Sequence, residues 1–88
     1  MVSEKIKIIN SLGLHARPAA QIVKITSKYQ CDVIIIKDDT EVNAKSIMGV
    51  MMLAAEQNSF LTVKCDGEGE KECLAELKEL ISNKFYEE

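Results

Sequence analysis

Hydrophobic and polar residues alternate along this chain with two periods, one typical of strands and one typical of helices. A period of two, or a run of β-branched residues, predicts strands at 4–9, 31–37, 40–44 and 60–65. A period near 3.6 predicts helices at 16–28, 46–57 and 70–85. An acidic pair between the second and third strands favours a hairpin turn. The predicted order is strand, helix, strand, strand, helix, strand, helix.

Apolar stripes on the first and last helices indicate how the layers pack. The first helix carries Ala16, Ala19, Ala20 and Val23, with Ile22 and Ile25 beside them. The last helix carries Leu74, Leu77, Ile81 and Phe85. A helix with a single apolar stripe buries that stripe against another layer. We therefore expect an α+β fold, with an antiparallel sheet covered on one face by helices.

Composition excludes several classes of function. The chain has 88 residues, 47% apolar and 28% charged, which predicts one packed domain over 1–88. A net charge of −3 without a basic cluster argues against direct nucleic-acid binding. No apolar run approaches the roughly 18 residues of a membrane span, and the N-terminus does not have a signal-peptide pattern. We expect a cytoplasmic protein without membrane insertion.

The chain has three cysteines, Cys31, Cys65 and Cys73, and no Cys-x-x-Cys motif. The odd count predicts reduced, structural thiols in a reducing compartment. With a single histidine in the chain, the pattern is not that of a zinc site. We expect neither a metal nor a cofactor.

Candidate chemistry lies in SLGLHARPAA, residues 11–20, which hold the only histidine and the only proline. His15 falls at the N-cap of the first helix or just before it, and Pro18 suits the first helical turn. The backbone N–H groups of Ala16 and Arg17, the helix dipole and the Arg17 guanidinium all favour an anion here. A neutral imidazole is a nucleophile, so a phosphoryl group on His15 would lie in a ready-made anion site.

The alternative is an ordinary turn that contains a histidine. A lone surface histidine usually has no function, and Arg17 alone is better explained as a solvated charge. No base, metal or second acid accompanies His15 in the sequence, and no carboxylate pair or triad is visible near it. This argues against a hydrolase.

The segment 43–57 predicts a helix that is apolar on more than one side. Ser46, Val50 and Leu53 share one side. The other side carries Ile47, Met48, Met51, Met52 and Ala55. A helix on a small sheet buries one side, so the other is expected to be an exposed patch that binds partners. Any single methionine is better explained as core, but the whole run favours an interface.

Ser46 is first of all a favoured N-cap residue. A phosphate on it would be stabilised by the helix dipole and would place about two negative charges beside the apolar patch. If both helices lie on one face of the sheet, their N-termini could open onto a common docking surface that includes Ile47, Met48 and Met51.

Two motifs, GLHARPAA at 13–20 and NAKSIMGVM at 43–51, strongly resemble those of HPr. HPr is the family of histidine-containing phosphocarriers of the bacterial phosphoenolpyruvate:sugar phosphotransferase system. The resemblance covers nearly the whole chain and is to the Gram-positive type with a regulatory serine. It implies an open-faced sandwich, a four-stranded antiparallel sheet with three helices on one side. It also implies a carrier rather than an enzyme, active in sugar transport and carbon catabolite regulation.

The resemblance also implies roles for residues. Enzyme I would transfer phosphate from phosphoenolpyruvate to Nδ1 of His15, Arg17 would stabilise it, and sugar-specific enzyme IIA proteins would receive it. Ser46 matches the serine that HPr kinase/phosphorylase modifies, and the modified form acts as corepressor for a catabolite control transcription factor. The residues expected on the docking surface are Ile47, Met48 and Met51, to which we add Ala20. We expect a monomer.

Two positions depart from the family pattern. Leu12 stands where members often have a polar residue, and Asn58 where many have glycine. Asparagine tolerates the left-handed backbone region, so the turn at Asn58 is still possible. Two other functions stay open: a regulatory module acting mainly through phospho-Ser46 and the apolar patch, and a carrier for a different phosphorelay. The presence of His15 excludes a regulatory paralogue without the histidine.

Overall fold

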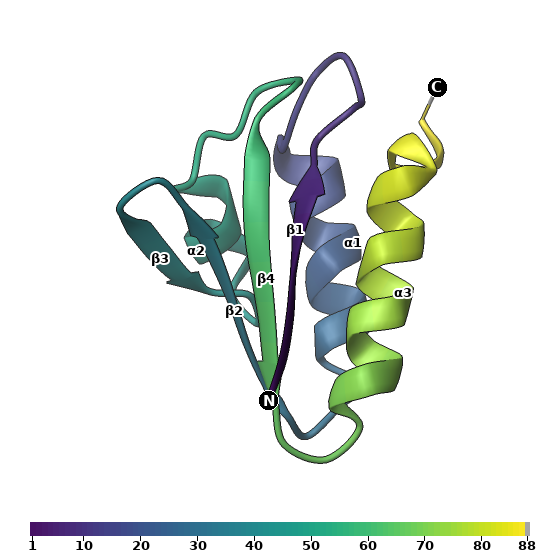
Figure 1. The fold of residues 1–88 in the computed structure, drawn as a ribbon. Helices are drawn as coiled ribbons and strands as arrows, with labels where there is room; N and C mark the ends of the chain where they lie inside the picture. Colours follow the sequence, from purple (N-terminus) through teal and green to yellow (C-terminus); the bar gives the residue numbers. More distant parts are fainter. Residues whose placement is uncertain (88) are drawn as a thin grey trace.

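A computed structural model describes residues 1–87 (Figure 1). In chain order its elements are β1 (Val2–Lys7), α1 (Ala16–Thr26), β2 (Asp32–Lys37), β3 (Thr40–Asn43), α2 (Ile47–Met51), β4 (Phe60–Asp66), α3 (Glu70–Ser82) and a terminal 3₁₀ turn, η1 (Lys84–Tyr86). The predicted order of strands and helices is confirmed. Strand boundaries differ from the predicted ones by one or two residues, whereas α2 differs much more.

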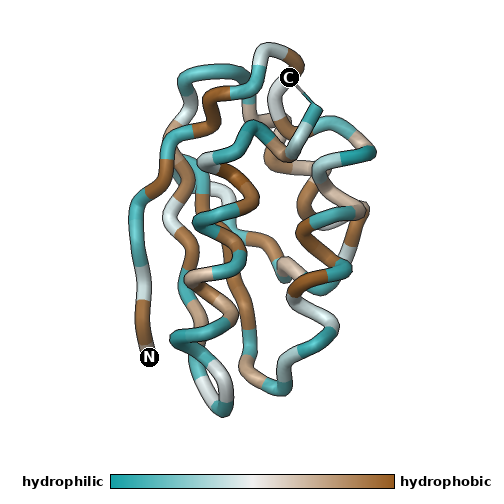
Figure 2. The backbone as a smooth tube through the Cα atoms, turned by 90° about the vertical axis from the view of Figure 1, so that its right-hand side faces the viewer, coloured by the Kyte–Doolittle hydropathy of each residue, from teal (hydrophilic) through white to brown (hydrophobic). Residues whose placement is uncertain are grey.

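The four strands form one antiparallel sheet in the order β1-β4-β2-β3. Along β4, Leu61, Val63 and Cys65 are buried, and the residues between them are partly exposed. The helices cover one face of the sheet and leave the other open (Figure 1). In Figure 2 hydrophobic and hydrophilic residues alternate along strands and helices, as expected where one side of each element is buried. The predicted α+β open-faced sandwich is confirmed.

Helix α1 packs on the sheet through a face that the predicted stripe identified only in part. Its buried residues are Pro18, Ala19, Ile22 and Thr26. Ala16 and Ala20, which the stripe included, are exposed. Thr26 can occupy the buried face because its hydroxyl donates to the carbonyl of Ala44 at 2.9 Å. Burying a hydroxyl that keeps a hydrogen bond costs little free energy, so Thr26 can lie among the apolar residues of the buried face.

The predicted last helix ends earlier than expected, at Ser82. Leu77 and Ile81 are buried as predicted, and Leu74 is partly buried against the core. Phe85 is also fully buried, but it belongs to η1 rather than to the helix. The three residues of η1 have φ angles of 57°, 55° and 57°, so the chain turns left-handed directly after α3.

Helix α2 ends at Met51, well before the predicted end at Gln57. The chain leaves the helix in a turn in which the N–H of Ala54 donates to the carbonyl of Met51 at 3.0 Å. Beyond this turn the carbonyl of Ala55 accepts from the N–H of Leu14 at 2.8 Å. Ala55, predicted to be exposed beside the methionines, is therefore buried. This contact with the loop before α1 overrides the helical propensity of the segment.

All three cysteines are free and buried. Burial raises the pKa of the Cys65 and Cys73 thiols, so both are protonated at neutral pH. The structure also brings the three sulfur atoms within 4.8 Å of one another, which their sequence spacing did not indicate.

Candidate functional site

His15 is the N-cap of α1, with φ of −83° and ψ of −170°. Its carbonyl accepts from the N–H of Ala19 at 3.0 Å, and its side chain makes no capping hydrogen bond. The first N–H groups of the helix, on Ala16 and Arg17, therefore have no capping side chain, and the helix dipole adds positive potential beside them. These are the two amides on which the predicted phosphate site depends.

The imidazole of His15 contacts Glu87, a residue that the sequence did not point to. Nε2 lies 3.0 Å from Oε1 of Glu87 and 3.3 Å from Oε2. An ionised carboxylate can only accept, so Nε2 donates, and in the neutral ring Nδ1 keeps its lone pair. Within residues 1–87 no group forms a hydrogen bond with Nδ1. The His15 side chain is 38% exposed.

Asn10 holds the Glu87 carboxylate in place. Its Nδ2 donates to Oε2 of Glu87 at 2.8 Å and to the carbonyl of Gly13 at 2.7 Å. Asn10 is fully buried and the Glu87 side chain is only 9% exposed. A carboxylate withdrawn from water needs donors, and Asn10 and His15 provide them.

No acid accompanies His15 among its neighbours in the sequence, but the folded chain brings Glu87, 72 positions away, to its ring. Strand β1 and helix α3 run in the same direction (Figure 1), so Glu87, which follows α3, lies beside the start of α1. The predicted order of elements contains a signal for this contact. If successive strands and helices alternate in direction, residues 84–87 fall at the same end of the molecule as His15.

The loops around His15 depend on two residues with left-handed backbone. Gly13 has a φ of 68°, and a Cβ atom there would collide with the carbonyl oxygen of Ala55. Only glycine fits this position, so the loop that leads into His15 is closely packed. Asn58 has a φ of 75°, which confirms that asparagine keeps the turn expected before β4.

Arg17 lies in the first turn of α1 and is exposed. Among residues 1–87 no side chain or backbone group pairs with its guanidinium. The structure therefore places Arg17 next to the uncapped amides but does not fix its side chain on His15.

Ser46 is the N-cap of α2, as predicted, and its Oγ accepts from the N–H of Gly49 at 3.1 Å. The preceding Lys45 donates through Nζ to the carbonyl of Tyr29 at 2.8 Å, beyond the C-terminal end of α1. Helix α2 then runs toward the loop before His15, so α1 and α2 are antiparallel (Figure 1). The two helix N-termini therefore do not lie side by side. That both border one docking surface, which includes Ile47, Met48 and Met51, stays a prediction.

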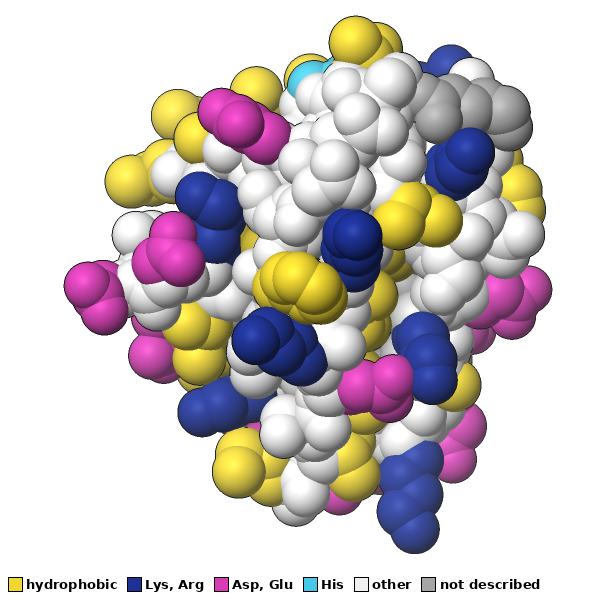
Figure 3. Space-filling view, turned by 45° about the horizontal axis from the view of Figure 1, so that its top comes forward, with side chains coloured by type: hydrophobic (Ala, Val, Ile, Leu, Met, Phe, Trp, Pro, Cys, Tyr) yellow, Lys and Arg dark blue, Asp and Glu magenta, His cyan; other side chains and the backbone are white. Residues whose placement is uncertain are grey.

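An exposed apolar patch on and after α2 is confirmed. We define the methionine patch as Ile47, Met48, Met51 and Met52, all of them exposed. Met48 and Met52 are 77% and 73% exposed, and Leu12 in the loop before His15 is exposed as well. Ala20, also predicted on the docking surface, is exposed on α1. Figure 3 shows hydrophobic side chains gathered along the edge of the molecule that carries the histidine.

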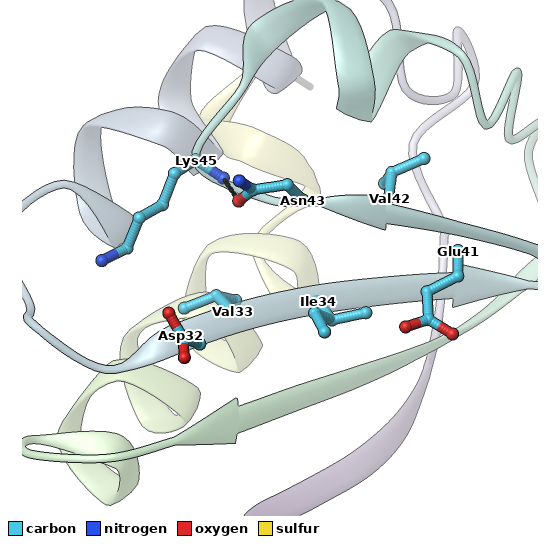
Figure 4. A pocket seen from close by; sticks show the side chains of 7 residues that line it. All are labelled: Asp32, Val33, Ile34, Glu41, Val42, Asn43 and Lys45. Atoms are coloured by element: carbon cyan, nitrogen blue, oxygen red, sulfur yellow. Dashed lines mark hydrogen bonds between the residues drawn. The ribbon is translucent and has the colours of Figure 1, made fainter.

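A hollow between β2 and β3 is separate from these residues (Figure 4). It is lined by Asp32, Val33, Ile34, Glu41, Val42, Asn43 and Lys45, none of them a predicted site residue. The predicted site is thus an open surface around His15, and the hollow is not part of it.

The family described as the PTS HPr component phosphorylation site matches residues 2–83. This chain belongs to the HPr family. HPr proteins are phosphocarriers of the phosphotransferase system, so the chain carries phosphoryl groups and is not a catalytic enzyme. None of the helices within residues 1–87 is long and apolar enough to cross a bilayer.

Individual relatives agree with this assignment. Phosphocarrier protein HPr of Xylella fastidiosa (strain Temecula1) is 44% identical over 88 residues, which cover 100% of this chain and 99% of the relative. The crystal structure of HPr-C-His from Thermoanaerobacter tengcongensis is 43% identical, with a TM-score of 0.95 over 100% of this chain and 99% of that one. Crh of Bacillus subtilis, a catabolite repression protein described as a swapped dimer, is 39% identical, with a TM-score of 0.76 over 96% and 97%.

Proposed function

We propose that this HPr-family carrier accepts a phosphoryl group from enzyme I on Nδ1 of His15. It then transfers the group to sugar-specific enzyme IIA proteins, and it works as a cytoplasmic monomer. The observation that carries this proposal is the contact between Nε2 and Glu87. This contact leaves the lone pair of Nδ1 free, on the residue that forms the N-cap of α1.

In the acceptor step, the Nδ1 lone pair attacks the phosphorus held by enzyme I. A nitrogen–phosphorus bond forms while the bond to the donor breaks, and the donor keeps that electron pair. The amides of Ala16 and Arg17 and the Arg17 guanidinium stabilise the charge on the phosphoryl oxygens. The Nε2 proton stays on the ring, and the Glu87 carboxylate opposes the positive charge that the ring acquires. In the second step a nucleophile on enzyme IIA attacks the phosphorus, the bond to Nδ1 breaks, and Nδ1 keeps the electron pair.

Incubation with enzyme I and labelled phosphoenolpyruvate tests this function. We expect acid-labile label on His15, which then moves to an added enzyme IIA protein. Label that appears only on Ser46, and only with ATP and a kinase, would instead support a purely regulatory module.

Replacement of Arg17 by alanine is expected to slow phosphoryl transfer by about 100-fold, the lower end of the effect of removing one anion-stabilising donor. The lower end applies because no described group fixes the guanidinium beforehand. Arg17→Lys should recover only part of the rate, because an ammonium group cannot make the two parallel hydrogen bonds of a guanidinium. The rates of phosphoryl transfer from enzyme I and to enzyme IIA, measured for each variant, test both effects. An unchanged rate for Arg17→Ala would show that Arg17 is only a surface charge.

A second role, regulation through Ser46, is favoured by the position of this residue. Ser46 is an exposed N-cap directly before the methionine patch. We propose that HPr kinase/phosphorylase modifies Ser46, as in the Gram-positive type of the family, and that the modified form binds a catabolite control transcription factor. Crh, a relative named for catabolite repression, supports this context.

The charge effect of Ser46 phosphorylation can be tested with Ser46→Asp. If enzyme I covers the methionine patch to reach His15, a charge at position 46 lies inside or at the edge of that interface. Its desolvation should weaken binding by roughly tenfold at low salt, or ~1.4 kcal/mol. The loss should shrink at high salt. Ser46→Ala, the matched neutral variant, should lose less.

Titration calorimetry at two ionic strengths measures these affinities, with amide NMR spectra as the control for the fold. Aspartate is also a good N-cap, so we expect the spectra to stay close to that of the unmodified chain. Equal affinities for Ser46→Asp, Ser46→Ala and the unmodified chain would exclude the electrostatic switch.

A further inference from the structure

The three cysteines form a compact cluster between α3 and the sheet. Cys31 directly precedes β2, Cys65 lies on β4 and Cys73 lies on α3. Because Val33 pairs with Cys65, Cys31 is diagonal to Cys65 across the two strands. The three sulfur atoms lie within 4.8 Å of one another, and all three residues are buried. Three elements far apart in the sequence thus supply three soft donor atoms at one point.

The number of donors limits which ion this cluster can hold. Within residues 1–87, no histidine, aspartate or glutamate belongs to the group. Structural zinc sites and iron–sulfur clusters need four protein ligands. Three thiol sulfurs in an apolar core fit a thiophilic ion that is satisfied by three ligands.

Charge limits the choice further. Three thiolates bring three negative charges, so a divalent ion would leave one unbalanced and copper(I) would leave two. The charged neighbour of Cys65 is the Glu70 carboxylate, which is itself negative and pairs with the N-terminal amine at 3.2 Å. A net negative charge in the buried cluster would add to the negative charge of Glu70, and uncompensated charge in a core is costly. With all three sulfurs bound as thiolates, only a trivalent ion gives a neutral complex.

We propose that Cys31, Cys65 and Cys73 form a buried trithiol site for a trivalent thiophilic ion, for which arsenic(III) is the natural probe. With arsenous acid, three arsenic–sulfur bonds form and three arsenic–oxygen bonds break. Each thiol proton leaves with a hydroxide as water, so no electron is transferred and no charge enters the core.

The turn between β4 and α3 lies over Cys31, so an ion from solvent would reach the cluster at this turn. A Cβ atom on Gly67 would lie 3.1 Å from Cα of Cys31 and 3.3 Å from its Cβ, so this exposed glycine covers Cys31 closely. Local opening of this turn would expose the sulfur atoms without unfolding the sheet.

The test is native mass spectrometry and thermal unfolding of the full chain with sodium arsenite, in a phosphine reductant. We expect one arsenic per chain, with the mass gain of one arsenic less three hydrogens. We also expect a higher Tm, because the folded chain holds three sulfurs together and the unfolded chain does not. A lowered Tm would mean that arsenite prefers the unfolded chain and would overturn the proposal. So would the absence of bound arsenic while all three thiols are reduced.

Single variants locate the site. Cys31→Ala, Cys65→Ala and Cys73→Ala each leave two thiols and should weaken arsenite binding by at least about 10- to 100-fold. Loss of a residue that only hydrogen-bonds to a ligand of a bound ion already costs that much, and each of these variants removes a ligand itself. Binding that is unchanged in all three variants would place the arsenic elsewhere. Zinc(II), tested alongside, should not be retained in native spectra. Tighter retention of zinc than of arsenic would contradict the neutral-site proposal.

Discussion

His15→Gln is expected to abolish phosphoryl acceptance from enzyme I while leaving the fold unchanged. Glutamine has no nucleophilic nitrogen, because its amide lone pair is delocalised into the carbonyl group. Its NH₂ group can still donate to Glu87, as Nε2 of His15 does at 3.0 Å. The side chain of His15 makes no capping bond and is partly exposed, so stability should change by only about 0.5 kcal/mol.

The measurement is incorporation of label from phosphoenolpyruvate, followed until the unmodified chain is fully phosphorylated. Binding of His15→Gln to enzyme I should persist, because the methionine patch is unaltered, and this binding is the control. Acid-labile label on His15→Gln would show that another residue accepts the phosphoryl group.

Phe85→Ala is expected to lower the free energy of unfolding by about 3–5 kcal/mol, the usual cost of deleting a buried aromatic ring. Phe85 is fully buried, although it lies in a turn whose three residues all have left-handed backbone. Such conformations cost about 1–2 kcal/mol per residue, so packing has to hold this turn in place. Gln21 adds one hydrogen bond, from Nε2 to the carbonyl of Phe85 at 3.1 Å.

Loss of the Phe85 ring should also disturb the contact between Glu87 and His15. Glu87 follows η1 directly, so release of the turn withdraws the carboxylate from Nε2 of His15. Urea unfolding measures the stability, and the His15 ring signals in NMR spectra report the contact. Tyr86→Ala is the matched control, because Tyr86 is exposed and its loss should cost only about 0.5 kcal/mol. Equal effects of the two variants would mean that Phe85 does not anchor the turn.

The layers of the fold were predictable because period and turn composition are local properties. Alternation along β4 identified Leu61 and Val63 as inward-facing, and the structure confirms both. Helix ends were less predictable, because tertiary contacts decide them. Residues after Met51 have helix-forming side chains, yet the bond from Leu14 to Ala55 draws the chain out of the helix.

The site was predictable only where it is made by consecutive residues. The N-cap position of His15 and the cap bond of Ser46 follow from the residues directly after them. The contact of His15 with Glu87 joins residues 72 positions apart, and no local pattern indicates it. The cysteine cluster was missed for the same reason, since its members come from three separate elements.

The position of the phosphoryl group on the His15 ring tests the central claim most directly. A chain labelled with ¹⁵N in histidine is followed by NMR before and after treatment with enzyme I and phosphoenolpyruvate. Before treatment, the neutral ring should carry its proton on Nε2, as the contact with Glu87 requires. After treatment, the phosphorus coupling should appear at Nδ1. Phosphorus coupled to Nε2, or no phosphorus on His15 at all, would contradict the proposal that Glu87 leaves Nδ1 free to accept the phosphoryl group.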